Sequence, residues 1–131
     1  KGYLDTFDKK TCSFAEHKTG HADRNGKAPW DRVKVHKHDQ LPFYSLLIKE
    51  SFGKVNNTCH LNWIETNVGQ KTIQFGKHTL TGGGKRIELT GKVKKFKRVI
   101  KEYERKKIRK SIIKVAKEIS DEYKKFKKNI L

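Results

Sequence analysis

Three histidines are the clearest candidates for acid–base chemistry in this sequence. His36 and His38 are two positions apart, so on a strand they would share one face, and Asp39 follows directly. Such groups can transfer protons near neutral pH, and a neighbouring lysine could hold a phosphate. With His60 as a further catalytic group, this pattern predicts a small, metal-independent ribonuclease as one alternative function.

The two cysteines suggest either a covalent link or a metal site. Cys12 and Cys59 are an even pair in a small chain, the setting in which one structural disulfide is useful. Zinc is the open alternative, because Cys12, His17 and His21 have ligand-like spacing and Cys59 or His60 could complete the site. A zinc site needs reduced thiols, so the two arrangements exclude each other. We expect the disulfide, no metal ion and no cofactor.

The strongest signal is basic charge towards the carboxyl end. Residues 92–131 contain 17 Lys and Arg and five acidic residues, whereas residues 1–91 contain 15 and nine. This density of cations predicts a surface that binds a polyanion, either a glycosaminoglycan or a nucleic acid. Lys outnumbers Arg, which favours diffuse contacts with sulfate or phosphate over the reading of base edges. The predicted binding residues are Lys94, Lys95, Lys97, Arg98, Lys101, Arg105, Lys106, Lys107, Arg109 and Lys110.

Composition limits the class of protein. The chain has 131 residues, of which 34% are hydrophobic and 35% charged, and its net charge is +18. This indicates one domain with a small core, and no apolar run is long enough to span a membrane. The sequence contains no Met, which predicts a processed chain. Asn56-Asn57-Thr58 is a glycosylation sequon. We therefore expect a secreted glycoprotein that carries a glycan at Asn56.

The predicted fold is α+β. Residues 1–40 lack a sustained hydrophobic period, so we expect an irregular arm tied down by the disulfide, with a short edge strand at Val33 and Val35. A helix is expected near 41–52, capped by Asp39, although a buried strand over Phe43–Ile48 would show the same apolar run.

An antiparallel meander of three strands is expected next, at 59–67, 71–80 and 85–90. Alternating residues define each strand, and Val68-Gly69-Gln70 and Gly82-Gly83-Gly84 would form the two reversals. The single domain would thus consist of the arm, a helix plus meander at 41–91, and a basic segment at 92–131.

The last forty residues are predicted to be helical, since neither Gly nor Pro follows Gly91. Their apolar residues form two stripes, one at Val93, Phe96, Ile100 and Tyr103 and another at Ile108, Ile112, Val115, Ile119, Tyr123, Phe126 and Ile130. The five-residue step from Tyr103 to Ile108 breaks the helical phase. We therefore expect a kink near residues 104–107 or a different partner for the second stripe, with self-association as one way to cover it.

The order of a helix, three strands and a basic helix resembles the topology of double-stranded RNA-binding domains over Gln40 to Lys107. The resemblance implies an RNA-binding function as a second alternative. However, that family has a glycine-rich loop leading into a Ser-Lys-Lys helix start, whereas here the glycines precede the last strand and the helix would begin at Lys92-Val93-Lys94-Lys95.

The function we predict is a secreted effector that binds a polyanion or an acidic protein surface by occupancy, without catalysis.

Overall fold

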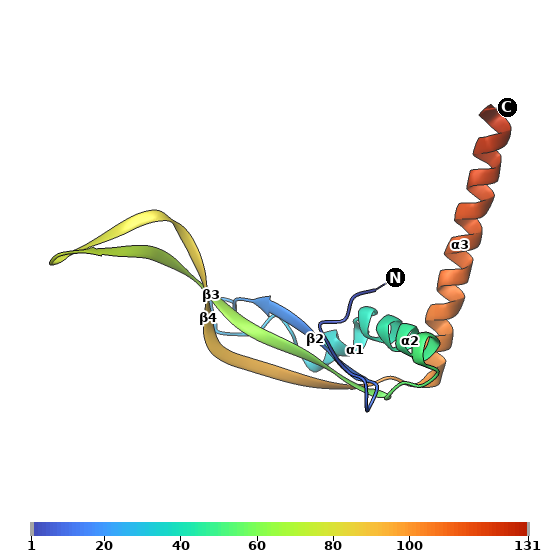
Figure 1. Ribbon diagram of the computed structural model, residues 1–131, viewed down its shortest axis with the longest axis horizontal. Helices are drawn as coiled ribbons and strands as arrows, with labels where there is room; N and C mark the ends of the chain where they lie inside the picture. Colours follow the sequence, from blue (N-terminus) through green and yellow to red (C-terminus); the bar gives the residue numbers. More distant parts are fainter. Residues whose placement is uncertain (1, 131) are drawn as a thin grey trace. The chain divides into compact units, whose positions relative to one another are not determined.

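The computed structural model describes residues 2–130, without the side chains of residues 70–73 and 81–85. It is an α+β fold, as the sequence predicted. Its elements (Figure 1) are β1 Thr6–Asp8, β2 Ser13–Gly20, α1 Arg32–Lys37, α2 Gln40–Phe52, β3 Thr58–Phe75, β4 His78–Val99 and α3 Glu102–Ile130. No helix in the described part of the chain is long and apolar enough to cross a membrane.

The sheet has the strand order β1-β2-β3-β4. β2 and β3 are parallel, with Ala15 opposite His60 and Lys18 opposite Trp63. Parallel neighbours need a long crossover connection, and the segment that carries α1 and α2 supplies it. β3 and β4 are joined by only Gly76 and Lys77, so they form an antiparallel hairpin (Figure 1).

Several elements of the predicted fold are wrong. The expected irregular arm contains β1, β2 and α1, and the predicted edge strand at Val33 and Val35 is part of helix α1. Two long strands replace the three-stranded meander, because both predicted reversals lie inside strands. The actual reversal has Gly76 at a φ of 59°, a value that glycine adopts without strain.

The prediction of helix α2 is confirmed, and the competing strand over Phe43–Ile48 is wrong. Its buried residues include Leu41, Tyr44 and Ile48, which recur with helical spacing. Asp39 precedes the helix as expected but makes no side-chain capping hydrogen bond. The helix ends at Gly53, whose φ of 72° is left-handed and whose N–H donates to the Lys49 carbonyl.

The carboxyl-terminal helix begins ten positions later than predicted. Val93 and Phe96 belong to strand β4, and α3 starts only at Glu102. The first stripe is thus not helical up to Ile100, which is why it has a different phase from the second. The expected kink is wrong because α3 runs without interruption to Ile130.

The chain divides into two compact units. Unit 1 consists of Lys1–Phe14, His38–Cys59 and Val99–Leu131, and unit 2 of Ala15–Lys37 and His60–Arg98. The sequence predicts a single domain over residues 1–131, and this stays a prediction. Each unit is described below by itself.

In unit 1, buried Arg105 connects three segments of the chain. Its guanidinium donates hydrogen bonds to Ser45 Oγ at 3.0 Å, Asn57 Oδ1 at 2.9 Å and the Ile100 carbonyl at 3.4 Å. It also pairs with Glu102 at 2.9 Å. Nearly every donor of the side chain has a partner, which is how a buried charge avoids a large desolvation cost.

In unit 2, the buried side chains come from all its elements. Trp63 and Leu61 of β3 and Val35 of α1 are at most 2% exposed. Arg98 of β4 is also buried, and its Nη2 donates to the His36 carbonyl at 3.2 Å near the carboxyl end of α1. A cation at a helix carboxyl end is electrostatically favourable, so this contact fastens β4 to α1.

Acid should weaken unit 1 through Glu102. The Lys49 ammonium, and then the Arg105 guanidinium, donate to its carboxylate and hold the pKa of Glu102 below its ordinary value of 4.5. A lowered folded-state pKa contributes stability above the unfolded value, and this is lost as the pH falls through the folded value. We expect the free energy of unfolding to fall as the pH drops below 4.5, and Glu102→Gln to flatten part of that slope.

Denaturant titrations at a series of pH values would measure this effect. Glu118→Gln is the matched control, since Glu118 lies on the same helix without an ion-pair partner among the described residues. Identical pH profiles for Glu102→Gln and Glu118→Gln would contradict the expectation.

Candidate polyanion-binding surfaces

The first basic surface lies on strand β4 in unit 2. Side chains alternate along a strand, and here Phe96 and Arg98 face inward while Lys95 and Lys97 are exposed. Lys92 and Lys94 are exposed as well. None of these four lysines is paired with an acid within the part of the chain that the structure describes. We call Lys92, Lys94, Lys95 and Lys97 the β4 cluster.

The second basic surface is the polar face of α3 in unit 1. Lys106, Lys107 and Lys110 are exposed on this helix, and we call them the α3 cluster. Lys101 is exposed just before the helix, whereas Arg109 forms an ion pair with Glu50 of α2. Further lysines that the prediction left out continue along the helix: Lys114, Lys117, Lys124, Lys125, Lys127 and Lys128.

The structure thus corrects the prediction of one continuous basic helix. Lys94, Lys95, Lys97 and Arg98 lie on a strand of unit 2, and the other predicted residues belong to unit 1. Arg98 and Arg105 are only 5% and 4% exposed and are engaged with protein groups. These two arginines are structural, so the surfaces left for an anion consist almost entirely of lysines.

Cys12 and Cys59 are both buried and are not joined by a disulfide, which corrects the prediction. Cys12 has a left-handed backbone, with a φ of 52°, and its Sγ lies 3.8 Å from the Lys9 carbonyl, in its own turn. The thiol is directed to the local backbone instead of to a bond with Cys59. No group of three or more potential metal ligands occurs in the described residues.

The histidines lose the shared strand face on which the ribonuclease hypothesis depended. His36 lies in helix α1 of unit 2. On a helix, side chains two positions apart point in nearly opposite directions. His38 belongs to unit 1, where its Nε2 lies 2.9 Å from Gln40 Oε1, and His60 lies on β3 in unit 2. Ribonuclease activity and RNA binding stay alternative predictions, without the catalytic strand and the meander that suggested them.

A pocket in unit 2 contains a histidine that the prediction had not weighed as catalytic. It has a volume of about 370 Å³, and His21, Asp23, Lys27 and Lys34 contribute to its lining. Asp23 is used locally, because its Oδ1 accepts the N–H groups of Asn25 and Lys27. Lys34 donates to the Pro29 carbonyl at 2.8 Å. These contacts fold the loop between β2 and α1.

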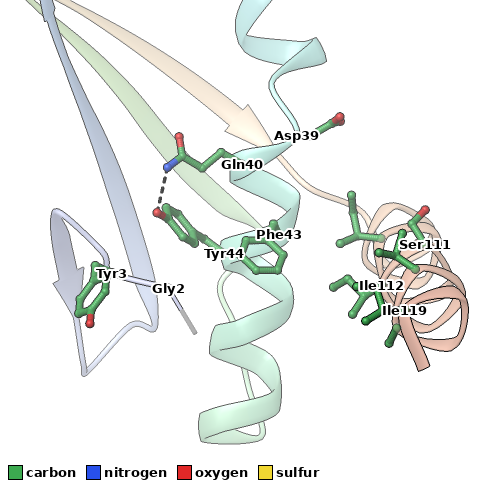
Figure 2. A pocket seen from close by; sticks show the side chains of 12 residues that line it. Gly2, Tyr3, Asp39, Gln40, Phe43, Tyr44, Ser111, Ile112 and Ile119 are labelled. Atoms are coloured by element: carbon green, nitrogen blue, oxygen red, sulfur yellow. Dashed lines mark hydrogen bonds between the residues drawn. The ribbon is translucent and has the colours of Figure 1, made fainter. Parts of the chain in front are cut away.

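An open groove lies in unit 1 between α2 and α3 (Figure 2). It has a volume of about 830 Å³. Phe43 and Tyr44 line one side, and Ile112 and Ile119 point towards them from α3 (Figure 2). This lining is almost entirely apolar, so the groove suits a hydrophobic partner better than an anion.

The sequon residue Asn56 is half-buried, two residues before the start of β3. Its Oδ1 accepts the N–H of Thr58 at 2.9 Å, and its own N–H donates to the Cys12 carbonyl at 3.0 Å. Glycosylation of Asn56 stays a prediction.

Comparisons with models of protein families, with curated proteins and with solved structures found no match for this chain.

Proposed function

We propose that this protein binds a sulfated or phosphorylated polyanion by occupancy, through the β4 and α3 clusters. The observation that carries the proposal is the β4 cluster, four exposed lysines without an acidic partner in the described chain. Lys95 and Lys97 share one face of an extended strand, about 7 Å apart. Charges spaced in this way can follow a repeating anionic polymer.

The use of lysine supports a glycosaminoglycan more than sequence-specific recognition of a nucleic acid. Arg provides the planar, bidentate contacts that identify bases. Here Arg98 and Arg105 are buried, whereas the cations of the β4 and α3 clusters are compact lysine charges that suit diffuse contacts with sulfate groups. We therefore take a sulfated glycosaminoglycan as the first polyanion to test.

The decisive measurement is the salt concentration that elutes the protein from heparin, compared with a plain sulfonate exchanger. Changing Lys94, Lys95 and Lys97 to Glu should lower elution from heparin more than elution from sulfonate. If each lysine neutralises one anionic group, the slope of log K against log salt concentration should lessen by up to about 3.

Two further variants complete this experiment. The Lys106, Lys107 and Lys110 to Glu variant makes the same charge change in the α3 cluster and measures that surface separately. The Lys9, Lys10 and Lys54 to Glu variant makes the same charge change at exposed lysines outside both clusters and is the matched control for charge alone. Equal losses on both resins for all three variants would show that only unspecific net charge is at work, and would refute the proposal.

Secretion, glycosylation and a role as an effector belong to the same proposal and are supported by the sequence. Expression through a eukaryotic secretory pathway should give a chain whose mass falls on enzymatic removal of N-glycans. Thr58→Ala should abolish that shift, because it destroys the sequon and leaves the Asn56 side chain in place. An unchanged mass for the parent chain would remove the glycan from the proposal.

A further inference from the structure

The apolar stripe of α3 lies open on the helix surface. Exposure ranges from 43% at Ile112 to 65% at Ile119 along the sequence Ile112, Val115, Ile119, Tyr123, Phe126 and Ile130. A contiguous apolar surface of this kind marks an interaction site in a soluble protein. The stripe and the helix that carries it belong entirely to unit 1.

The spacing of the stripe keeps it on one side of the helix. From Ile108 it advances by 4, 3 and 4 residues to Ile119, and by the same steps to Ile130. An 11-residue repeat has about 3.67 residues per turn, close to the 3.6 of a straight α-helix. The stripe therefore presents a nearly straight apolar line about 33 Å long, which suits another helix lying alongside it.

Helix α2 of the same chain does not fill this surface. Ile108, Ile112, Val115 and Ile119 line the open groove together with Phe43 and Tyr44 of α2 (Figure 2). The rest of the stripe, at Tyr123, Phe126 and Ile130, does not line the groove. A helix that packs against both α3 and the open side of the groove would fit this surface.

The charges beside the stripe indicate what this helix is. At 100° per residue, the rim on one side of the stripe is Ser111, Glu118, Glu122 and Asn129, and the rim on the other side is Arg109, Ala116, Ser120 and Lys127. The charged residues of one rim are acids and those of the other are cations. The helix is therefore complementary to a copy of itself, provided that the acidic rim of one meets the basic rim of the other.

Only a parallel pair brings unlike rims together, because a two-fold axis along the helices places the two different rims opposite each other. Glu122 then faces Lys127 of the second copy, and Glu118 faces its Tyr123 hydroxyl. An antiparallel pair joins like rims, with Glu118 beside Glu122 and Arg109 beside Lys127. Both arrangements bury the stripe, so charge decides between them.

We propose that a second copy of this chain docks on α3, with the two helices parallel and in register along Ile112 to Ile130. Each helix covers the other's stripe and closes the open side of its α2–α3 groove. The ion pairs on the present helix, such as Lys125 with Glu122, are exposed and exchange at little cost. The interface shares no residue with the β4 or the α3 cluster, because Lys106, Lys107 and Lys110 lie on the side of α3 away from the stripe. Dimerisation and polyanion binding can therefore be tested independently.

Sedimentation of the full chain tests the association. Ile119→Glu should raise the dissociation constant of the dimer by at least about a hundredfold, because the change occurs once in each copy. Ile113→Glu is the matched control: the same substitution on the same exposed helix, off the stripe, where the dimer should persist. A parent chain that stays monomeric at millimolar concentration would overturn the proposal. So would a monomer that binds anionic vesicles through Ile119.

A cysteine at the end of the stripe tests the orientation. In the parallel pair, Ile130→Cys should form an intermolecular disulfide in the dimer, since the native Cys12 and Cys59 are buried. In an antiparallel pair the two introduced thiols would lie at opposite ends of the stripe, about 27 Å apart at 1.5 Å per residue, and would not join. A dimer without this cross-link would overturn the parallel arrangement.

Reversing the rim charges gives a second readout of orientation. Glu122→Lys and Lys127→Glu should each weaken the dimer, and the double variant should restore it by exchanging the two partners. Association should strengthen with added salt, because screening reduces the repulsion between two chains of net charge +18. Heparin binding should weaken under the same change, so the two activities separate in one titration.

Discussion

Changing Arg105 to alanine is expected to lower the free energy of unfolding by about 3 kcal/mol. The side chain is 4% exposed and donates to Ser45 of helix α2, to Asn57 before β3 and to Ile100 after β4. Its removal leaves the buried Ser45 hydroxyl without this partner, and desolvated polar groups without partners account for much of such a loss. Its pairing with half-exposed Glu102 contributes less, because water screens that charge.

Denaturant unfolding followed by circular dichroism would measure this loss. Arg109→Ala is the matched control, since Arg109 lies one turn further along α3 and its ion pair with Glu50 is half-exposed. It should change stability by no more than about 0.5 kcal/mol. Arg105→Lys should recover only part of the loss, because an ammonium cannot reproduce the fork of the guanidinium. Equal midpoints for the two alanine variants would contradict this role of Arg105.

The Arg105 network also bears on polyanion binding. Because this guanidinium is buried, folded Arg105→Lys protein should elute from heparin at the salt concentration of the parent chain, whereas the sequence had placed Arg105 among the binding residues. Buried arginines cannot be told from exposed ones in a run such as Arg105-Lys106-Lys107. Only the packing of residues 48 and 60 positions away in the sequence, Asn57 and Ser45, reveals the difference.

The same kind of inward arginine explains why strand β4 was mistaken for helix. Phe96, Arg98 and Ile100 are the more buried positions of an alternating segment, with Lys95, Lys97 and Val99 exposed between them. An apolar residue at position 98 would have shown the strand period directly. With arginine there, the remaining apolar residues Val93, Phe96 and Ile100 imitate a helical stripe.

Where the local pattern was complete, the sequence was sufficient. Helix α2 follows from its apolar spacing and from Gly53, and the second stripe of α3 follows from seven apolar residues that keep one phase. The hairpin was not predictable, because its turn at Gly76-Lys77 competes with the more obvious glycines at 82–84. The pairing of β3 with β4 along the whole length of β3 decides which glycine forms the turn. Strand pairing depends on residues that are far apart in the sequence, so it is not a local property.

The sequence predicted which residue types form the candidate site, namely lysines, but it did not predict how they are arranged. Lys95 and Lys97 were correctly expected to be near other cations, but on a helix instead of a strand, and the lysines beyond Lys110 were missed. The signal for the latter was present: Lys124, Lys125, Lys127 and Lys128 repeat the dense charge of the earlier segment. A charge count gives the net attraction to an anion, whereas the spacing of the charges depends on which element carries them.

Changing Trp63 to alanine should destabilise unit 2 by about 3–5 kcal/mol. Trp63 is 2% exposed on β3, where Lys18 of β2 is its register partner, and it is the largest fully buried side chain of the described residues. Its indole N–H has no hydrogen-bond partner within that part of the chain, so the loss comes from packing alone. For the same reason, Trp63→Phe forfeits volume but no hydrogen bond, and should cost much less.

Fluorescence provides the measurement, because Trp30 remains as a half-buried probe in the same unit when Trp63 is replaced. Ile87→Ala is the control, since Ile87 lies on the same hairpin with 74% exposure and should cost under about 0.5 kcal/mol. If Trp63→Ala and Ile87→Ala unfold at the same denaturant concentration, Trp63 does not anchor unit 2. If Trp63→Ala, and not Ile87→Ala, abolishes the unfolding transition in Trp30 fluorescence, the hairpin that carries the β4 cluster depends on the Trp63 side chain for its fixed geometry. The same variant should then bind heparin no better than its net charge dictates.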